Sequence, residues 1–355
     1  MSEIDFLKQK YPTLSRRLRR VNLADLPTPV KAVDIKVNSQ PRALSIKYDN
    51  LTGSVYGGNK VRKLEYIFPR VNDRHCLRVA TFGAVGSNHA LATALYAREV
   101  GLECTCFLSH QAQTPMVAPT LNAHIRNGTE LVRYGGAYQN RLAILREALW
   151  GRHTWVIPMG GSSWLGTIGF VAAGLELCEQ IKNGEIELPD KLFVGTGTMG
   201  TAVGLALGIA LAGETIEINA VRVSDRLIMN SAAMRTLLRK TIAMMRALDD
   251  SIPADLEAAT NIRIRDGFYG PGYAQGTDAT DEAIKFSNDQ LGLTLETTYT
   301  GKTMAALLAD MRDPEMDNLN FLYWHTYNSV PFDGSPDKPL DDSALPDQFL
   351  KYFKN

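Results

Sequence analysis

The chain has 355 residues, of which 45% are hydrophobic, and its 38 lysines and arginines balance its 38 aspartates and glutamates. This length can bury a large core in one or two domains, and zero net charge gives no global attraction to nucleic acid or to an anionic membrane. No apolar run reaches the ~18 residues of a membrane span, and the charged stretch from Met1 to Arg20 lacks the apolar centre of a secretory signal.

The N-terminal part predicts a surface helix, an extended segment and two strands. Met1 to Arg20 is polar and basic, as expected of a helix on the surface. Leu26 to Val30 is extended, because each proline disfavours helix for the residue before it. Apolar alternation predicts strands over 33–37 and 43–48, and Asp49 to Gly53 has turn residues.

From Lys63 onward, strands, glycine loops and helices alternate, which is typical of parallel βαβ units. The predicted strands cover 77–82, 102–108, 130–134, 155–157, 192–194 and 216–223. The predicted helices cover 88–100, 119–127, 139–150, 167–183 and 201–211. The pattern therefore predicts an α/β fold.

The C-terminal part predicts mostly helices. Residues 226–256 are helical and mixed in polarity, and 263–276 form a loop rich in glycine and tyrosine. Further helices are predicted over 280–290, 302–311 and 345–353, with a last strand over 320–325. No internal repeat or low-complexity segment is present.

The cysteines carry no metal or redox pattern. Cys76, Cys104, Cys106 and Cys178 form no C-x-x-C pair and no cluster with histidine. We therefore expect free thiols in a reducing compartment, a cytoplasmic protein and no metal site.

A lysine follows two glycines in the run Gly57-Gly58-Asn59-Lys60. The glycines let the backbone turn sharply and let a ligand approach closely. The positive end of a helix that begins here disfavours the ammonium form of Lys60, and Schiff-base chemistry needs a partly deprotonated lysine. A loop followed by a surface helix with solvated lysines explains the run equally well when it is taken alone.

A glycine loop stands between the predicted strand 192–194 and the predicted helix 201–211. Free N–H groups and the helix dipole make such a junction an anion site, although a tightly packed turn is the alternative. The loop is not a nucleotide P-loop, because no lysine follows it. Its residues are Gly195, Thr196, Gly197, Thr198, Met199, Gly200 and Thr201.

A second junction carries Ser87, Asn88 and His89. Ser87 and Asn88 are good helix N-caps, which is a sufficient structural explanation. The functional alternative is that the same exposed N–H groups hold a substrate carboxylate. His89 is a minor candidate for a base, since a histidine in a first helical turn is as often a packing residue.

Together the three runs resemble the fold-type II pyridoxal-phosphate (PLP) enzymes, and more narrowly the family of D-cysteine desulfhydrase and 1-aminocyclopropane-1-carboxylate (ACC) deaminase. The order of runs is similar from Leu26-Pro27-Thr28-Pro29 to Trp324-His325-Thr326. The resemblance implies a tryptophan synthase β-like fold with two parallel-sheet α/β domains and PLP between them. It also implies a small inserted domain at 64–170, a large domain formed by 1–63 and 171–355, and a homodimer.

The resemblance also implies roles for the site residues. Lys60 would hold PLP, the loop from Gly195 to Thr201 its phosphate, Asn88 its phenolic oxygen and Thr326 its pyridine nitrogen. Substrate binding would involve Ser87, Asn88 and His89, with Ser87 also counted as catalytic. Tyr273 and Tyr299 would line the substrate pocket and assist proton transfers, with a pKa lowered by the cationic cofactor.

The expected substrate depends on Thr300. At the matching position, directly after the tyrosine that matches Tyr299, ACC deaminase has a glutamate. A threonine there favours α,β-elimination on a small amino acid, with D-cysteine giving pyruvate, sulfide and ammonia as the single best guess. ACC deamination, PLP-dependent β-replacement and a non-catalytic amino-acid binder remain alternatives. Several positions depart from the family: Gly86 replaces a glutamine, Tyr327-Asn328 a pair of glycines, and Tyr48 and Asn50 an arginine and an aspartate.

Overall fold

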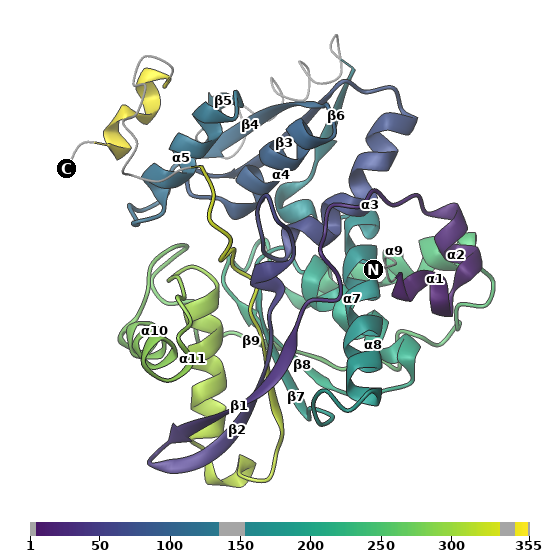
Figure 1. Cartoon of the computed structure of the whole chain (residues 1–355), viewed down its shortest axis with the longest axis vertical. Coiled ribbons are helices and arrows are strands. Elements are labelled where there is room, and N and C mark those ends of the chain that lie inside the picture. The colour runs from purple at the N-terminus through teal and green to yellow at the C-terminus, as the bar shows by residue number, and fades with distance from the viewer. Residues whose placement is uncertain (1–4, 135–152, 334–344, 354–355) are drawn as a thin grey trace.

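The computed structural model describes residues 5–134, 153–333 and 345–353, and the helix predicted over 139–150 lies outside these ranges. The described chain forms two separate sheets, and Figure 1 shows the smaller one above the larger one. The six-stranded sheet has the order β1-β2-β10-β7-β8-β9, and the four-stranded sheet has the order β5-β4-β3-β6.

The large sheet is parallel except at one edge. A hairpin supplies that edge, where β1 (Val30–Val37) runs antiparallel to β2 (Gln40–Lys47). Asn38 and Ser39 join them with φ angles of 50° and 64°, as a two-residue hairpin turn requires. The other strands are β7 (Lys191–Thr196), β8 (Glu217–Arg222), β9 (Ile262–Arg265) and β10 (Phe321–Trp324).

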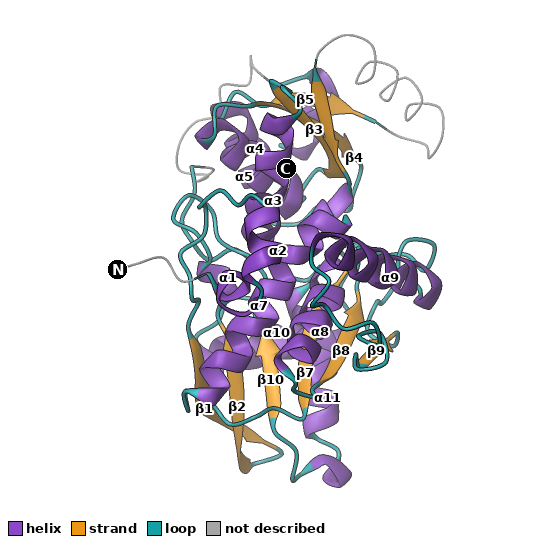
Figure 2. Cartoon of the chain, turned by 90° about the vertical axis from the view of Figure 1, so that its right-hand side faces the viewer, coloured by secondary structure: helices purple, strands orange, loops and turns teal. Residues whose placement is uncertain are grey.

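Helices cover both faces of the large sheet, because its central strands are apolar on both sides. Leu192 and Val194 pack in one hydrophobic cluster, whereas Phe193 between them packs in another. On the first face lie α7 (Trp164–Lys182), α8 (Gly200–Ala212) and α9 (Ser231–Leu248), and on the second α10 (Asp278–Leu291) and α11 (Thr300–Met311) (Figures 1 and 2).

The small sheet is entirely parallel and shares one cluster with the chain's C-terminal segment. Its strands are β3 (Arg78–Ala84), β4 (Glu103–Ser109), β5 (Glu130–Arg133) and β6 (Thr154–Ile157). Its helices are α3 (Lys60–Asp73), α4 (Asn88–Glu99) and α5 (Val117–Arg126). Leu345, together with Phe349 and Tyr352 of the 3-10 helix that follows it, completes the same hydrophobic cluster.

We propose that residues 64–170 form the inserted domain, because this segment carries every strand of the described four-stranded sheet. Both boundaries fall inside helices, the first in α3 and the second in α7. These two helices pack against each other, so the proposed domains share a continuous helical connection.

Three predicted elements differ from the structure. The N-terminal segment forms two short helices, α1 (Phe6–Lys10) and α2 (Pro12–Arg17), whose leucines Leu7 and Leu14 are fully buried. The short strand β9 overlaps the start of the loop predicted over 263–276, because four residues alternating isoleucine and arginine give too brief a pattern. The C-terminal helix is a 3-10 helix over Asp347–Tyr352.

A buried ionic cluster lies directly behind the lysine run. Arg62 on α3 contacts Asp49 through Nη2 at 2.8 Å and Glu176 on α7 through Nη1 at 2.8 Å. Lys47 at the end of β2 contacts Glu176 through Nζ at 2.6 Å. Two cations thus balance two carboxylates, which is how buried charges are tolerated. The cluster ties the hairpin strand, α3 and α7 together.

Candidate active site

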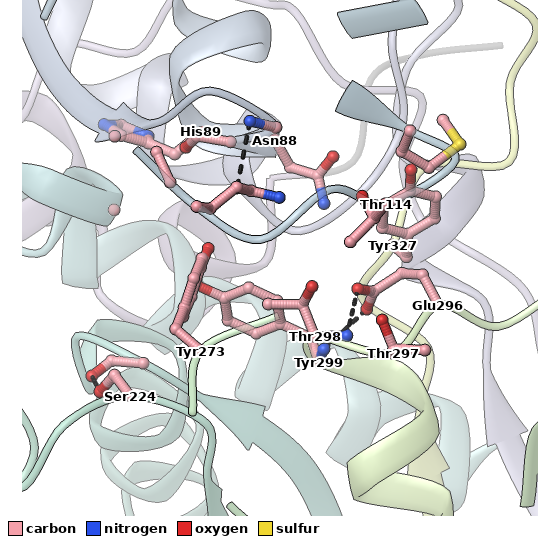
Figure 3. Close-up of a pocket in the computed structure, with 18 of the residues that line it drawn as sticks. Asn88, His89, Thr114, Ser224, Tyr273, Glu296, Thr297, Thr298, Tyr299 and Tyr327 are labelled. Carbon is pink, nitrogen blue, oxygen red and sulfur yellow. Dashed lines mark hydrogen bonds between the residues drawn. The ribbon is translucent and has the colours of Figure 1, made fainter. Parts of the chain in front are cut away.

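A cavity of about 530 Å³ lies between the two sheets. The carboxyl ends of strands from both sheets open toward it, as is general for open α/β folds. The small sheet contributes residues after β3, β4 and β6, and the large sheet contributes residues after β7, β8 and β10. Figure 3 shows Asn88 and His89 on one side of this cavity, with Tyr273, Tyr299 and Glu296 on the other.

Lys60 lines this cavity as the first residue of α3. Its backbone is fixed by the preceding turn: Gly58 has a φ of +90°, and a Cβ there would lie 2.8 Å from the Thr326 carbonyl oxygen. The N–H of Asn59 donates to that same carbonyl at 3.1 Å. Burial lowers the pKa of Lys60 to about 8. The direction agrees with the expected partly deprotonated lysine, and the cause is desolvation of the buried ammonium group.

The predicted anion loop runs from the end of β7 into the N-terminus of α8. Gly197 and Thr198 line the cavity, and the turn closes at Met199, which takes a left-handed φ of 66°. The Thr201 hydroxyl accepts from the Asn59 amide at 3.1 Å, so the loop is joined to the lysine run. Thr196 instead turns inward and donates to the Val194 carbonyl.

Lys63 and Ser162 complete this end of the site, although neither residue belongs to the predicted site. The Ser162 hydroxyl lies 3.2 Å from Lys63 Nζ, 3.2 Å from the Gly200 nitrogen and 2.7 Å from the Thr198 hydroxyl. One oxygen atom is therefore surrounded by three potential donors at the N-terminus of α8. The available signal was helical spacing, since Lys63 follows Lys60 by three residues.

The N-terminus of α4 forms the opposite wall. The Ser87 hydroxyl caps the helix by accepting the N–H of Ala90 at 3.3 Å, and the Asn88 amide oxygen accepts from the Tyr56 hydroxyl at 2.9 Å. His89 lies behind them, with Nε2 at 2.8 Å from the Thr81 hydroxyl. Burial, together with the charges of nearby lysines, lowers the pKa of His89 well below its usual range. The imidazole is therefore held neutral and is a poor base.

Tyr273 and Tyr299 meet edge to face in the cavity, with ring centroids 6.2 Å apart. A Cβ at Gly197 would lie 3.0 Å from the Tyr299 hydroxyl, and Lys60 Nζ lies 5.8 Å from the centre of the same ring. Burial raises the pKa of both tyrosines. The main cause is desolvation of the two hydroxyls, and the expectation that a bound cationic cofactor lowers the pKa remains a prediction.

The two threonines of interest differ in position. Thr326 lines the cavity at the end of β10, whereas Thr300 lies outside it and bonds through its hydroxyl to Glu296. Glu296 itself lines the cavity and was missed by the sequence analysis. Its carboxylate accepts the N–H groups of Thr298, Tyr299 and Thr300 at 2.7–2.8 Å, so it caps α11 (Figure 3).

The departures at 327 and 328 have separate effects. Tyr327 lines the cavity and adds bulk to its wall. Asn328 is buried instead and accepts the N–H of Gly57 at 2.6 Å, which stabilises the turn before Lys60. Only the first change therefore reshapes the space available to a ligand.

The described ranges contain no trio of histidine, cysteine, aspartate or glutamate placed to hold a metal ion. None of the described helices combines the length and apolar character needed to cross a membrane. All four cysteines are free thiols.

Comparison with known proteins places the chain in a family. Residues 21–321 match the family model described as pyridoxal-phosphate dependent enzyme. A D-cysteine desulfhydrase of Salmonella schwarzengrund is 31% identical over 325 residues, which cover 87% of this chain and 94% of that protein. The D-cysteine desulfhydrase of Salmonella paratyphi A is also 31% identical over 325 residues, with the same coverage of both chains.

A solved structure of an ACC deaminase homologue is 26% identical, with a TM-score of 0.73, and the match covers 90% of this chain and 94% of that one. Serine racemase from Dictyostelium discoideum is 17% identical with a TM-score of 0.59, covering 92% and 98%, and so shares the fold. These matches confirm the expected fold class and cofactor. The chain belongs to the family of pyridoxal-phosphate dependent enzymes, with the fold-type II architecture.

Proposed function

We propose that the protein is a lyase that carries out α,β-elimination on a small amino acid, with D-cysteine giving pyruvate, sulfide and ammonia. The observation that carries the proposal is the single cavity that brings together Lys60, two protonated tyrosines and the N-terminus of α4. The similarity to D-cysteine desulfhydrases over most of the chain supports the choice of substrate.

The residues around Thr198, which lines the cavity, fit the cofactor. A phosphate needs donors at a helix N-terminus, and the Ser162 hydroxyl oxygen already lies among such donors from Lys63, Thr198 and Gly200. We propose that these groups and the loop from Gly195 to Thr201 hold the phosphate and that Lys60 forms the covalent link. Asn88 and Thr326 would meet the ring's phenolic oxygen and nitrogen.

When bound, PLP draws electrons from the substrate Cα, so that the proton on this carbon becomes acidic. Lys60, with a pKa of about 8, can accept that proton near neutral pH. The N–H groups at the start of α4, with Ser87 and Asn88, orient the substrate carboxylate. His89 contributes to the proposed substrate site through its backbone rather than as a base.

The tyrosines act on the leaving group in this proposal. Because burial raises the pKa of Tyr273 and Tyr299, both hydroxyls carry their protons at neutral pH. A protonated hydroxyl can donate to a departing thiolate and cannot serve as a base at the start of the reaction. The tyrosines are therefore assigned as acids, and Lys60 as the base.

The reaction is tested with purified holoenzyme and four amino acids: D-cysteine, L-cysteine, β-chloro-D-alanine and ACC. We expect release of 2-oxo acid and ammonia from D-cysteine and β-chloro-D-alanine, with sulfide from D-cysteine. Turnover of ACC alone would identify a deaminase instead. Turnover of none of the four would contradict the proposed reaction and favour β-replacement or amino-acid binding.

Replacing Tyr299 by phenylalanine is expected to lower kcat by ~10²-fold, which is a typical contribution of one positioned acid. The covalent link of PLP to Lys60 should remain, because the lysine and the phosphate loop hold the cofactor independently of this hydroxyl. The matched control is Tyr323→Phe, whose hydroxyl donates to the Thr300 carbonyl outside the cavity. Equal kcat values for Tyr299→Phe and wild type would remove Tyr299 from the proton transfers.

We also propose that the enzyme is a cytoplasmic homodimer. The four free thiols are compatible with a reducing compartment. Leu227, whose side chain is 91% exposed, is the residue that we choose to test for a role in the subunit contact. Sedimentation analysis of the wild type and of Leu227→Asp tests the dimer.

A further inference from the structure

A glutamine from a different element reaches the wall of the cavity beside the start of α4. Gln111 follows β4, is only 7% exposed and lines the cavity. Its amide oxygen accepts the N–H of Gly86 at 3.1 Å. No oxygen of the described residues accepts a hydrogen bond from its amide nitrogen. The loop after β4 therefore brings an unused donor to the site.

Gly86 fixes the direction of this donor. Because the backbone N–H needs an acceptor, the amide oxygen of Gln111 faces it, and the amide nitrogen lies over the open side of Gly86. A Cβ at position 86 would lie 2.9 Å from that nitrogen and 3.3 Å from the oxygen. The absence of a side chain at Gly86 is thus what leaves room for the glutamine amide.

The neighbouring donors belong to the first turn of α4. The first N–H groups of a helix have no acceptor within the helix, and the Ser87 hydroxyl satisfies that of Ala90. The N–H groups of Asn88 and His89 are left for a ligand. An anion placed there would lie next to Gly86 and the amide of Gln111.

We propose that Gln111 is a substrate-binding residue whose amide nitrogen donates to the α-carboxylate of the amino acid. The inference rests on the proposed function in taking the start of α4 as the carboxylate site. A neutral amide gives a directional bond to one carboxylate oxygen, so it discriminates against an amine that lacks the carboxylate.

The test compares ligands with and without a carboxylate on three variants of the PLP-loaded enzyme. Alanine, in both D and L forms, carries the carboxylate and has no β-leaving group, whereas ethylamine lacks the carboxylate. The variants are Gln111→Leu, Gln111→Glu and the control Gln113→Glu. Gln113 lies in the same loop, is exposed and donates to the Tyr352 carbonyl at 3.1 Å. Binding is followed by the change in the cofactor's visible absorbance.

We expect Gln111→Leu to weaken alanine binding by about ten- to a hundredfold, as for loss of a hydrogen bond to a charged group. Gln111→Glu should weaken it further, because its carboxylate repels that of the ligand. The affinity for ethylamine should stay within a factor of two of the wild-type value in both Gln111 variants. Gln113→Glu should bind alanine as the wild type does, and thermal unfolding midpoints should confirm that all variants fold.

Alanine binding unchanged in Gln111→Glu, or an equal loss for alanine and ethylamine, would overturn the inference. Sulfide release from D-cysteine by the wild type is measured in parallel. A wild type that binds alanine in a Gln111-dependent way without releasing sulfide would support the inference and contradict the proposed reaction. A wild type whose absorbance responds to neither form of alanine would overturn both.

Discussion

Replacing Lys60 by alanine is expected to abolish the covalent retention of PLP and to lower the elimination rate by about 10³-fold or more. The side chain has two proposed roles, as the group that links the cofactor and as the base for the substrate Cα. Borohydride reduction followed by peptide mapping measures the link, and 2-oxo acid release measures the rate. The fold should persist, because Lys60 makes no ion pair that holds the described elements together.

The pKa of Lys60 also predicts a pH dependence. With a pKa of about 8, half of this lysine is neutral at pH 8, whereas a lysine with the ordinary value of 10.5 would be ~0.3% neutral. The rate at which apoenzyme links PLP should therefore rise with pH through the range near 8 and then level off. A rate that keeps rising to pH 10 would show an unperturbed lysine.

Two other lysines provide controls for the assignment. Burial lowers the pKa of Lys302 to about 8 as well, but its Nζ donates to the Gly272 carbonyl at 3.0 Å and it does not line the cavity. Lys302→Met should keep the covalent link. Lys63, also with a lowered pKa, lies three residues after Lys60 on the same helix. A reduced adduct found on Lys63 would refute the assignment of Lys60.

Arg62→Met is expected to lower the free energy of unfolding by about 3–5 kcal/mol, the usual cost of removing one partner from a buried ion pair. Arg62 is 1% exposed, and its loss leaves Asp49 and Glu176 with Lys47 as the one remaining cation of the cluster. One carboxylate would then be buried without a counter-charge. Urea unfolding of the PLP-free protein, followed by circular dichroism, measures the change.

Arg62→Met should also change how the free energy of unfolding depends on pH in the acidic range. Burial alone would raise the pKa of Glu176, but Arg62 and Lys47 lower it to about 2 from the usual 4.5. A lowered pKa contributes stability that is present above the unfolded value and lost as the pH falls from about 4.5 toward 2. Arg62→Met should therefore lose less stability than the wild type over that range.

Arg239→Met is the matched control for the ionic cluster, because Arg239 pairs with Glu257 on the exposed surface of α9. Exposed pairs of this kind contribute little to stability. An unfolding curve for Arg62→Met that coincides with that of Arg239→Met would show that the buried cluster does not stabilise the fold.

The order of elements was predictable from the sequence because each element has a local signal. Glycines such as Gly101 and Gly213 end helices, and apolar runs such as Leu192 to Val194 mark buried strands. The short strand β9 was not predicted, because four residues give only a weak alternating pattern. The pairing of Arg62 with Glu176 could not be predicted from the sequence, because partners 114 positions apart leave no local pattern.

The candidate site was predictable only in part. The family motifs indicate Lys60 and the anion loop, and the structure places Gly197 and Thr198 in one cavity with Lys60. Gln111 and Glu296 could not be found this way, because they stand on loops whose sequence has no fixed motif. Their positions depend on how β4 and α11 pack, which is a property of the tertiary structure.

The order of the large sheet has a consequence for how the protein is made. Strand β10 lies between β2 and β7, with Leu322 opposite both Ser45 and Leu192. The ribosome releases β10 long after its two neighbours, so until then these strands face each other across an unfilled position with open edges. Nascent chains held at this stage are therefore exposed to edge-to-edge association. Slower translation near the end of the message should therefore lower the yield of active protein, whereas chaperone supply at that point should raise it.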